Sequence, residues 1–505
     1  MKVLLIQSPR RYWPFLSEGD NYILPMWMPC IAAALRNSGH DVTCIDCMAS
    51  KTGWKKLETI ISEHQPDAVG ISESHALYIN ESLKLAGLVK QVDPGIITIC
   101  GGGHFSNTSK EILQNPDIDF IVKGEGEITV TRLLDALQSG RDPVSVKGIA
   151  FMNDGTYLQT SPRALIEDLD DLPIPAYDLM PMDKYGTSKY LFSPGGITVS
   201  HSRGCSSSCS FCVWWVQMAD RRLQDGTEKL YPRWRTKSVK RTVDEIEYLA
   251  DNYKRKCFIF VDGSWNISST WNEEFAAEIK KRGLDINWFA FMRVDCILRD
   301  IENGIMDRLV ESGLAHICIG AEHSAAHIMD DLNKDAQDWQ ITESCLRSLK
   351  KKYPGLFVQA TFIVGTKKES RETLQHLAEN VRKLKVDYPA FHAFTPVPGT
   401  LMYETALKNN WLEIQDYEYY DWNTPVISTD ELSREDMQYC LYELYRKSVS
   451  VMWLLKGLFS RSRYKRNMYI WWLIVTFRVI ISSLKDMIKP MKHSARLIEP
   501  KWYNS

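Results

Sequence analysis

Three cysteines lie close together near the middle of the chain, directly after a short apolar stretch. They are Cys205, Cys209 and Cys212, in the segment Arg-Gly-Cys-Ser-Ser-Ser-Cys-Ser-Phe-Cys at residues 203–212. Soft thiolates at this CxxxCxxC spacing can wrap one corner of an iron–sulfur cluster. Three ligands leave one iron of a [4Fe–4S] cluster open to an exogenous ligand. A zinc site lacking its fourth ligand and purely structural cysteines are the alternatives, although zinc usually takes paired CxxC units or one such unit with two histidines.

The elements around this motif must place it at one edge of a sheet. Apolar strand candidates recur at residues 197–202, 257–261, 287–292, 316–320, 357–364 and 390–395. Helical patterns separate several of them, at residues 243–252, 273–282 and 373–383. Six such strand–helix units predict a partial (β/α)6 barrel over residues 193–405, and chemistry in such barrels belongs at the carboxyl ends of the strands. The cysteines follow the first of these strands.

The first part of the chain, residues 1–160, shows a similar alternation. Short apolar runs at 3–7, 41–46, 67–72, 96–100 and 119–123 alternate with helical segments such as 28–38 and 80–92. Continuous apolar strands between helices predict a Rossmann-like parallel sheet covered on both faces. Glycines stand just after two of these strands, at 101–103 and 124–126, where open α/β sheets bind ligands.

Two further regions complete the layout. Residues 161–192 include an acidic stretch with two prolines at 166–178, which predicts a linker. Residues 406–505 carry no strand pattern and predict a helical C-terminal region. Its most apolar run, from Met468 to Leu484, has 17 residues and contains Arg478, whereas a spanning helix needs about 20. Buried packing is one interpretation of this run, and a helix lying on an anionic membrane is the other.

Composition excludes several classes of protein. The chain has 505 residues, of which 44% are hydrophobic and 25% charged, so a disordered or fibrous chain is not expected. The net charge of −2 gives no case for nucleic-acid binding. The start lacks the pattern of a signal peptide, and the 12 cysteines do not resemble a disulfide framework, so we expect a cytoplasmic protein with reduced thiols.

The cysteine motif, with Phe211 before the third cysteine, resembles that of the radical S-adenosylmethionine (SAM) enzymes. In that family the open iron of a [4Fe–4S] cluster binds S-adenosyl-L-methionine. Its reductive cleavage gives a 5′-deoxyadenosyl radical that abstracts hydrogen from unactivated carbon. The cofactors carry this chemistry, and the protein positions them and excludes water and oxygen. The resemblance implies an enzyme in which Cys205, Cys209 and Cys212 hold the cluster.

Later strand ends match the same family position by position. The backbone of Phe211 resembles the family's adenine contact, and Asp262 with Gly263 falls where the family holds the methionine amino group. Arg293 resembles the contact to the methionine carboxylate, and Glu322 the contact to the ribose hydroxyls. For each residue alone, an ordinary loop contact is the alternative.

The domain before the barrel resembles the cobalamin-binding domain of one large class of radical SAM enzymes. The positions that carry this resemblance are the loop residues Ser72, Ser74 and His75, the turn Gly101, Gly102 and Gly103, and the element Gly124, Glu125 and Gly126. Glycines permit close approach of a ligand, and hydroxyl groups offer compact hydrogen-bonding groups. The resemblance therefore implies cobalamin as a third cofactor.

One departure concerns the cobalt. The DxHxxG loop that supplies a histidine to cobalt is absent, because the first loop, residues 7–14, contains no histidine. Ligation by His75 or His104 and a domain without cofactor remain open alternatives. The pair Cys44 and Cys47 resembles a CxxC motif, but strand alternation puts the two thiols on opposite faces, which predicts core packing.

The complete layout most resembles the group that includes the anaerobic magnesium-protoporphyrin IX monomethyl ester cyclase. This resemblance implies modification of an unactivated C–H position, by an oxidative cyclase acting on a tetrapyrrole-like substrate or by a C-methyltransferase. A non-catalytic cobalamin- or metal-binding sensor module is the alternative. Expected partners are a small-molecule, lipid or tetrapyrrole-like substrate and an electron donor such as flavodoxin or ferredoxin. Residues 456–492 are a candidate for peripheral contact with the inner membrane surface.

Overall fold

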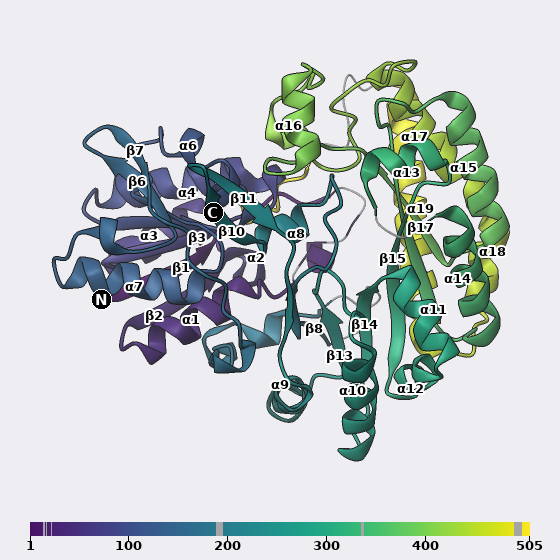
Figure 1. The fold of residues 1–505 in the computed structure, drawn as a ribbon, viewed down its shortest axis with the longest axis horizontal. Coiled ribbons are helices and arrows are strands. Elements are labelled where there is room, and N and C mark those ends of the chain that lie inside the picture. Colours follow the sequence, from purple (N-terminus) through teal and green to yellow (C-terminus); the bar gives the residue numbers. More distant parts are fainter. Residues whose placement is uncertain (14–15, 17, 22, 188–194, 335–337, 489–496) are drawn as a thin grey trace.

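The computed structural model describes residues 1–13, 16, 18–21, 23–187, 195–334, 338–488 and 497–505. Two α/β units lie side by side (Figure 1). The N-terminal unit is the purple and blue half, and the second unit, in teal and green, carries the C-terminal helices on its outer side. The α/β layout expected from the sequence is confirmed.

The N-terminal unit is built on a seven-stranded sheet with the order β2-β1-β3-β4-β5-β6-β7. Its strands are β1 (Lys2–Gln7), β2 (Asp41–Asp46), β3 (Ala68–Ser72), β4 (Ile97–Gly101), β5 (Phe120–Val122), β6 (Ile149–Asn153) and β7 (Thr156–Gln159). The first five strands pair in parallel, as predicted. The last two form an antiparallel hairpin on the edge, which the sequence did not predict.

Helices cover both faces of this sheet. They are α1 (Trp27–Asn37), α2 (Cys47–Ser50), α3 (Trp54–His64), α4 (Ile79–Val92), α5 (Gly103–Asn107), α6 (Ser109–Ile112) and α7 (Gly126–Gln138). Val3 and Leu5 pack in the core under α1 and α7, whereas Leu4 and Ile6 pack in the core under α3 and α4. Burial on both faces explains why β1 is apolar along its whole length.

The two thiols of the CxxC-like pair lie in different cores. Cys44 packs against the first of these cores, and Cys47 belongs to the second. The structure places Cys47 at the start of α2 rather than in β2. Burial raises the pKa of the Cys44 thiol to about 12. These are packing residues, as predicted.

The second unit is an open sheet of six parallel strands with the order β17-β16-β15-β14-β13-β8. The strands are β8 (Gly196–Val199), β13 (Cys257–Phe260), β14 (Asn287–Met292), β15 (Leu314–Glu322), β16 (Phe357–Val364) and β17 (Tyr388–Ala393). This is the predicted partial barrel. The first predicted strand divides in two, because β9 (Ser202–Gly204) leaves the sheet and pairs with β12 (Trp234–Thr236).

A hairpin of β10 (Asp220–Gln224) and β11 (Thr227–Tyr231) lies between β9 and β12 in the chain. The helices of this unit are α8 (Val213–Gln217), α9 (Val239–Tyr253), α10 (Ser269–Lys281), α11 (Val294–Glu302), α12 (Ile305–Glu311), α13 (Ala326–Leu332), α14 (Trp339–Lys352) and α15 (Arg371–Leu384). The C-terminal helices are α16 (Leu401–Lys408), α17 (Arg434–Ser448), α18 (Val451–Gly457) and α19 (Arg463–Ile488).

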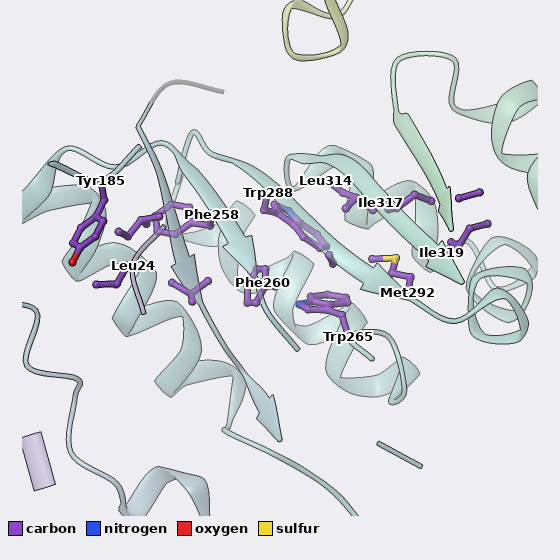
Figure 2. Close-up of a cluster of buried hydrophobic side chains, with 14 of the residues drawn as sticks. Leu24, Tyr185, Phe258, Phe260, Trp265, Trp288, Met292, Leu314, Ile317 and Ile319 are labelled. Atoms are coloured by element: carbon purple, nitrogen blue, oxygen red, sulfur yellow. The ribbon is translucent and has the colours of Figure 1, made fainter. Parts of the chain in front are cut away.

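The outer face of the second sheet is the main hydrophobic core of this unit. Figure 2 shows Phe260, Trp265 and Trp288 stacked between the strands and the helices. The ring centroids of Trp265 and Trp288 lie 4.6 Å apart, and both side chains are fully buried. On the opposite, inner face a smaller cluster joins Ile259, Phe289 and Cys318. The two faces therefore differ. Helices fill the outer face, whereas α19 covers the inner face at the amino-terminal ends of the strands, where it packs against Phe357 and Tyr388. The part of the inner face toward the carboxyl ends of the strands is left for the site.

The predicted linker carries only short 3-10 turns in its described part, up to residue 187. Two of its tyrosines are buried rather than exposed. Tyr177 and Tyr185 are almost inaccessible, and the Tyr185 hydroxyl donates to Asp46 Oδ2 at 2.8 Å. The Tyr177 hydroxyl donates to Glu245 of α9, so the linker packs against both units.

The apolar run of the tail packs beneath the second sheet. Trp471 and Trp472 of α19 are 7% and 5% exposed and contact Tyr388. Tyr469 donates a hydrogen bond to Asp387 Oδ1 at 2.6 Å. This agrees with the buried-packing interpretation. Within the described residues no helix has the length and hydropathy needed to cross a membrane. Residues 489–492 of the predicted membrane-contacting segment lie outside the described residues.

Candidate functional site

The cysteine loop begins at the end of β9 and ends at the start of α8. Cys205 follows Gly204 directly, and Cys212 is the N-cap residue of α8. Gly204 has φ +84°, and a Cβ added to it would lie 1.8 Å from the carbonyl oxygen of Arg233. Only glycine fits this position, so the direction in which the chain enters the loop is fixed.

Neighbouring segments hold the loop by its backbone. Ser210 N donates to the carbonyl of Leu332 at 3.1 Å, and Met402 N donates to the carbonyl of Ser210 at 3.0 Å. Trp215 Nε1 donates to the carbonyl of Cys209 at 2.9 Å. The phenyl ring of Phe211 packs in the cluster that contains Leu332. The loop is therefore anchored to α13, α8 and α16.

The three thiols are half-buried. Burial raises the pKa of Cys209 to about 12 and that of Cys212 to about 11; the backbone N–H groups of Trp214 and Trp215 oppose the second shift. Metal binding requires thiolates, so iron must displace protons from these residues. No group of three His, Cys, Asp or Glu side chains within the described ranges is arranged to hold one metal ion. In a [4Fe–4S] cluster each thiolate binds a different iron, so the three sulfur atoms need not converge on one point. Three cysteines on one loop fit this requirement.

Asp262 lies directly behind the loop, wholly buried. Its Oδ1 accepts hydrogen bonds from the backbone N–H groups of His201 and Ser202, at 3.0 and 2.5 Å, and from the Ser202 hydroxyl at 2.7 Å. His201 Nδ1 lies 3.0 Å from the same oxygen. Oδ2 has no hydrogen-bond partner among the described residues. Asp262 thus fixes the entry to β9, and one oxygen is left for a ligand.

Gly263 and Arg293 both face the cysteine loop. A Cβ on Gly263 would lie 3.3 Å from the carbonyl oxygen of Gly204. The Arg293 guanidinium donates to both carboxylate oxygens of Asp295, at 3.1 and 3.0 Å, and to the hydroxyl of Ser207. A guanidinium has five N–H donors, so two stay available to a ligand carboxylate. Ser207 and Asp295 are contacts that the sequence analysis missed.

Glu322 lies at the end of β15, where a register shift interrupts the pairing with β16. Its φ is +56°, and its Oε1 accepts a hydrogen bond from Lys334 Nζ at 2.6 Å. The Lys334 ammonium also opposes the burial-induced rise in the pKa of Cys209. A lysine between the predicted ribose contact and a cluster cysteine has no sequence signature, because it comes from the loop after α13.

The predicted cobalamin-binding loops meet at the carboxyl edge of the N-terminal sheet. Ser74 Oγ accepts a hydrogen bond from Gly103 N at 3.1 Å, and Gly102 N-caps α5 with φ +90°. The close approach at Gly103 is made by protein: an added Cβ would lie 2.3 Å from Gln217 Nε2 of α8. Gly103 therefore allows α8 of the second unit to approach the N-terminal sheet closely.

Unpartnered polar atoms mark the same edge. His104 is 2% exposed, and neither ring nitrogen has a hydrogen-bond partner among the described residues. Burial lowers the pKa of His104 to about 4. The Ser8 hydroxyl after β1 is buried and unpartnered as well. Buried polar groups are nearly always hydrogen-bonded, so these atoms fit a polar ligand at the edge where cobalamin is expected.

A segment after α16, residues 411–427, closes the space between the two units. The ring of Tyr417 lies 4.8 Å from that of His104, and the ring of Trp422 lies 5.6 Å from that of His75. Glu418 accepts a hydrogen bond from Arg11 at 2.9 Å. The sequence showed only that this region is aromatic. Its position over the two predicted cobalamin-binding loops, those of His75 and His104, depends on tertiary structure.

The fold and the cysteine loop define the class of protein, a radical SAM enzyme with a cobalamin-binding domain. The family described as B12 binding domain matches residues 13–134, and the radical SAM superfamily matches residues 199–381. Each match falls on one of the two sheets. The [4Fe–4S] cluster, when bound, supplies the electron that cleaves SAM to the 5′-deoxyadenosyl radical.

Relatives extend this assignment over most of the chain. The uncharacterized methyltransferase PH0819 of Pyrococcus horikoshii is 30% identical, over 83% of this chain and 86% of its own length. The anaerobic magnesium-protoporphyrin IX monomethyl ester cyclase of Rubrivivax gelatinosus is 29% identical, over 88% of this chain and 77% of its own length. The chain belongs to the cobalamin-binding radical SAM family.

A solved structure shares the fold. The radical SAM methyltransferase TsrM of Kitasatospora setae, solved with cobalamin and a [4Fe–4S] cluster, superposes with a TM-score of 0.69 at 15% identity, over 95% of this chain and 99% of that one. The chain is thus a cobalamin-dependent radical SAM enzyme that modifies an unactivated C–H position by C-methylation or oxidative cyclisation. Its cofactors are the cluster, SAM and cobalamin. The sensor alternative gains no support.

Proposed function

We propose that the enzyme C-methylates a small molecule with a flat or apolar body, bound on the inner face of the second sheet. The observation that carries this proposal is the composition of that face. Strand pairing puts Phe291, Thr361 and His392 on the same side as the inner cluster of Ile259, Phe289 and Cys318. Phe291 is 38% exposed, although it belongs to a central strand. An exposed phenyl ring at that position is available to a substrate.

Few polar groups accompany these apolar side chains. Burial lowers the pKa of His392 to about 4, so its ring is neutral at pH 7, and its Nδ1 has no hydrogen-bond partner among the described residues. The Thr361 hydroxyl donates to the carbonyl of Ile319 at 3.3 Å. A mainly apolar lining with a few polar groups that fix orientation is typical of small-molecule sites. Neutral groups suit a substrate that carries little charge next to the reacting carbon.

The proposed residue roles follow from the same geometry. Cys205, Cys209 and Cys212 hold the cluster, and the backbone beside Phe211 contacts the adenine. Arg293, Glu322 and the Asp262–Gly263 turn hold the carboxylate, ribose and amino group of SAM. The cobalamin contacts are the turn Gly101, Gly102 and Gly103 and the loop with Ser72, Ser74 and His75, together with Gly124 and Gly126. We keep the predicted division of the chain into a cobalamin-binding domain (1–160), a linker (161–192), a radical SAM barrel (193–405) and a helical C-terminal region (406–505).

Product analysis separates methylation from cyclisation. Anaerobically reconstituted enzyme with cobalamin, a reductant and methyl-labelled SAM is incubated with a panel of tetrapyrroles, polycyclic lipids and aromatic amino acids. We expect 5′-deoxyadenosine and S-adenosylhomocysteine in similar amounts, with the label in one product. 5′-Deoxyadenosine without S-adenosylhomocysteine would favour oxidative cyclisation, the candidate supported by the cyclase relatives. Release of neither compound would reject both.

Two partners complete the proposal. A one-electron donor such as flavodoxin or ferredoxin reduces the cluster. The outer side of α18 and the turn that follows it contact an anionic membrane surface, since Met452 and Phe459 are 66% and 86% exposed and Lys456 lies between them in the chain. Basic residues next to exposed apolar side chains favour such contact.

Vesicle binding tests the membrane contact. We expect the protein to co-sediment with vesicles that contain anionic phospholipid and not with neutral vesicles. The change of Met452 and Phe459 to serine should reduce this binding at least tenfold, because each loses about 1–2 kcal/mol of apolar burial in the interface. Equal sedimentation with both kinds of vesicle would argue against the contact.

A further inference from the structure

Two arginines stand directly opposite each other at the base of the cysteine loop. Arg203 of β9 pairs in register with Arg235 of β12 in an antiparallel ribbon. Like charges at directly opposed positions destabilise such a ribbon. The ribbon leads into Cys205 through Gly204, whose backbone direction is fixed by Arg233. An anionic partner must therefore come from elsewhere for this part of the loop to be stable.

That partner comes from the N-terminal unit. Glu125 Oε1 accepts hydrogen bonds from Arg203 Nη1 at 2.9 Å and from Arg235 Nη1 at 3.0 Å. Glu127, in the first turn of α7, accepts from Arg203 Nη2 at 2.5 Å. Glu125 Oε2 also accepts from the backbone N–H of Ile166 in the linker, at 2.8 Å. The N-terminal unit, the linker and the cluster ribbon thus meet at these two carboxylates.

The network is buried and electrically balanced. The side chains of Arg235, Glu125 and Glu127 are 4%, 4% and 6% exposed, and that of Arg203 is 16% exposed. Two positive and two negative groups leave no net charge inside the interface. A charge is held in such a place only by close partners with good hydrogen bonds. Moving the ribbon away from α7 would break these contacts and leave charges buried without partners.

We propose that Glu125 and Glu127 are positioning residues for the iron–sulfur cluster. By holding Arg203 they fix the cysteine loop to the cobalamin-binding unit, and so set the place of the cluster relative to the second cofactor. Glu125 therefore acts on the cluster loop rather than on cobalamin, the role that the family resemblance suggested. The inference does not depend on the substrate, because it concerns the loop that every SAM cleavage uses.

A matched pair of variants tests this role. Glu127→Gln removes one of the two carboxylate charges that face Arg203 and leaves that of Glu125 in place. Glu228→Gln is the control. Glu228 also contacts a cation across the interface, Lys123 at 3.3 Å, and one in its own hairpin, Arg221 at 3.1 Å. Among the described residues it forms no hydrogen bond or ion pair with the β9–β12 ribbon. Both reconstituted proteins are compared for iron and cobalamin content, for the electron paramagnetic resonance (EPR) spectrum of the reduced cluster with and without SAM, and for the rate of 5′-deoxyadenosine formation.

We expect Glu127→Gln to retain iron and cobalamin, to show an altered EPR response to SAM and to form 5′-deoxyadenosine at least tenfold more slowly. The control should match the parent protein. A purely structural contact would not move the EPR response of a folded, iron-loaded protein. Parent-like spectra and rates in Glu127→Gln would overturn the proposal.

A second variant keeps the proposal testable if Glu127→Gln does not fold. Arg203→Met combined with Glu127→Met removes one complete ion pair, so no unpaired charge from that pair is left in the interface, and such replacements are usually tolerated. Glu125 and Arg235 still pair with each other. We expect this protein to fold and to show the same altered EPR response and slow SAM cleavage. If it folds and behaves like the parent, the network only joins the two units and the positioning role is wrong.

Discussion

Replacing Cys205, Cys209 and Cys212 together with alanine is expected to abolish both cluster binding and SAM cleavage. The three thiolates are the proposed protein ligands, and in the part of the chain that the structure describes no other element supplies a comparable set at this sheet edge. Enzymes of this kind accelerate their reactions by at least ~10⁶-fold, so the rate should fall to background. The measurements are iron and sulfide content after anaerobic reconstitution, the EPR signal of the reduced protein, and 5′-deoxyadenosine released from SAM.

A second cysteine pair provides the control. Cys44→Ala with Cys47→Ala removes two thiols that lie in two different cores. We expect a loss of about 1 kcal/mol of stability for each change, as for a typical core substitution, and a full complement of iron. The triple variant must also show the parent's far-ultraviolet circular dichroism. Full turnover by the folded triple variant would show that the cluster is bound elsewhere.

The sequence predicts the positions of the parallel strands well, because these strands are buried on both faces and therefore form continuous apolar runs. The bounds of β2, β14 and β16 agree with the predicted ones. The hairpin β10–β11 was missed, since its half-exposed strands carry few apolar residues in a row. The edge hairpin β6–β7 was missed although β6 has the apolar run 149–152, because its partner β7 is short and half-exposed. Strand β9 was merged with β8, because no residue between them signals a turn.

Of the site, the sequence predicts which residues follow each strand but not what each side chain contacts. Asp262 was predicted from its position, yet its hydrogen bonds to His201 and Ser202 depend on how β8 and β13 lie together. The contact of Glu125 with Arg203 joins residues 78 positions apart. The segment at 411–427 reaches both units from the far end of the chain. Such contacts arise when the two units pack together, and the local sequence pattern does not predict that packing.

The interface between the units explains why several predicted ligand positions contact protein. Gly103 lies against Gln217 of α8, and Glu125 binds two arginines. In a chain with two cofactor sites, both sheets point their carboxyl edges at the shared space. Residues at those edges must hold the units at a fixed separation as well as bind ligands. A buried network of charges resists sliding of one unit past the other, because separating a buried charge from its partner leaves that charge without compensation.

Arg293→Met is expected to weaken SAM binding more than any other single change outside the cysteines. The guanidinium has two N–H donors left after its bonds to Asp295 and Ser207, and a ligand carboxylate would use them. Hydrogen bonds to charged groups contribute about 1.5–3 kcal/mol, which corresponds to a change of roughly 10- to 150-fold in affinity. The measurement is the SAM concentration at half-maximal 5′-deoxyadenosine formation.

Two further variants separate this role from charge and from folding. Arg293→Lys keeps the charge but loses the forked geometry, so an intermediate effect is expected. Arg308→Met is the matched control, because Arg308 forms a half-exposed ion pair with Glu273 on the outer helices. It should leave the SAM dependence unchanged. A parent-like half-saturation in Arg293→Met, with the cluster intact, would mean that the carboxylate of SAM is held by another group. Arg293 would then serve only to tie Ser207 of the cysteine loop to Asp295.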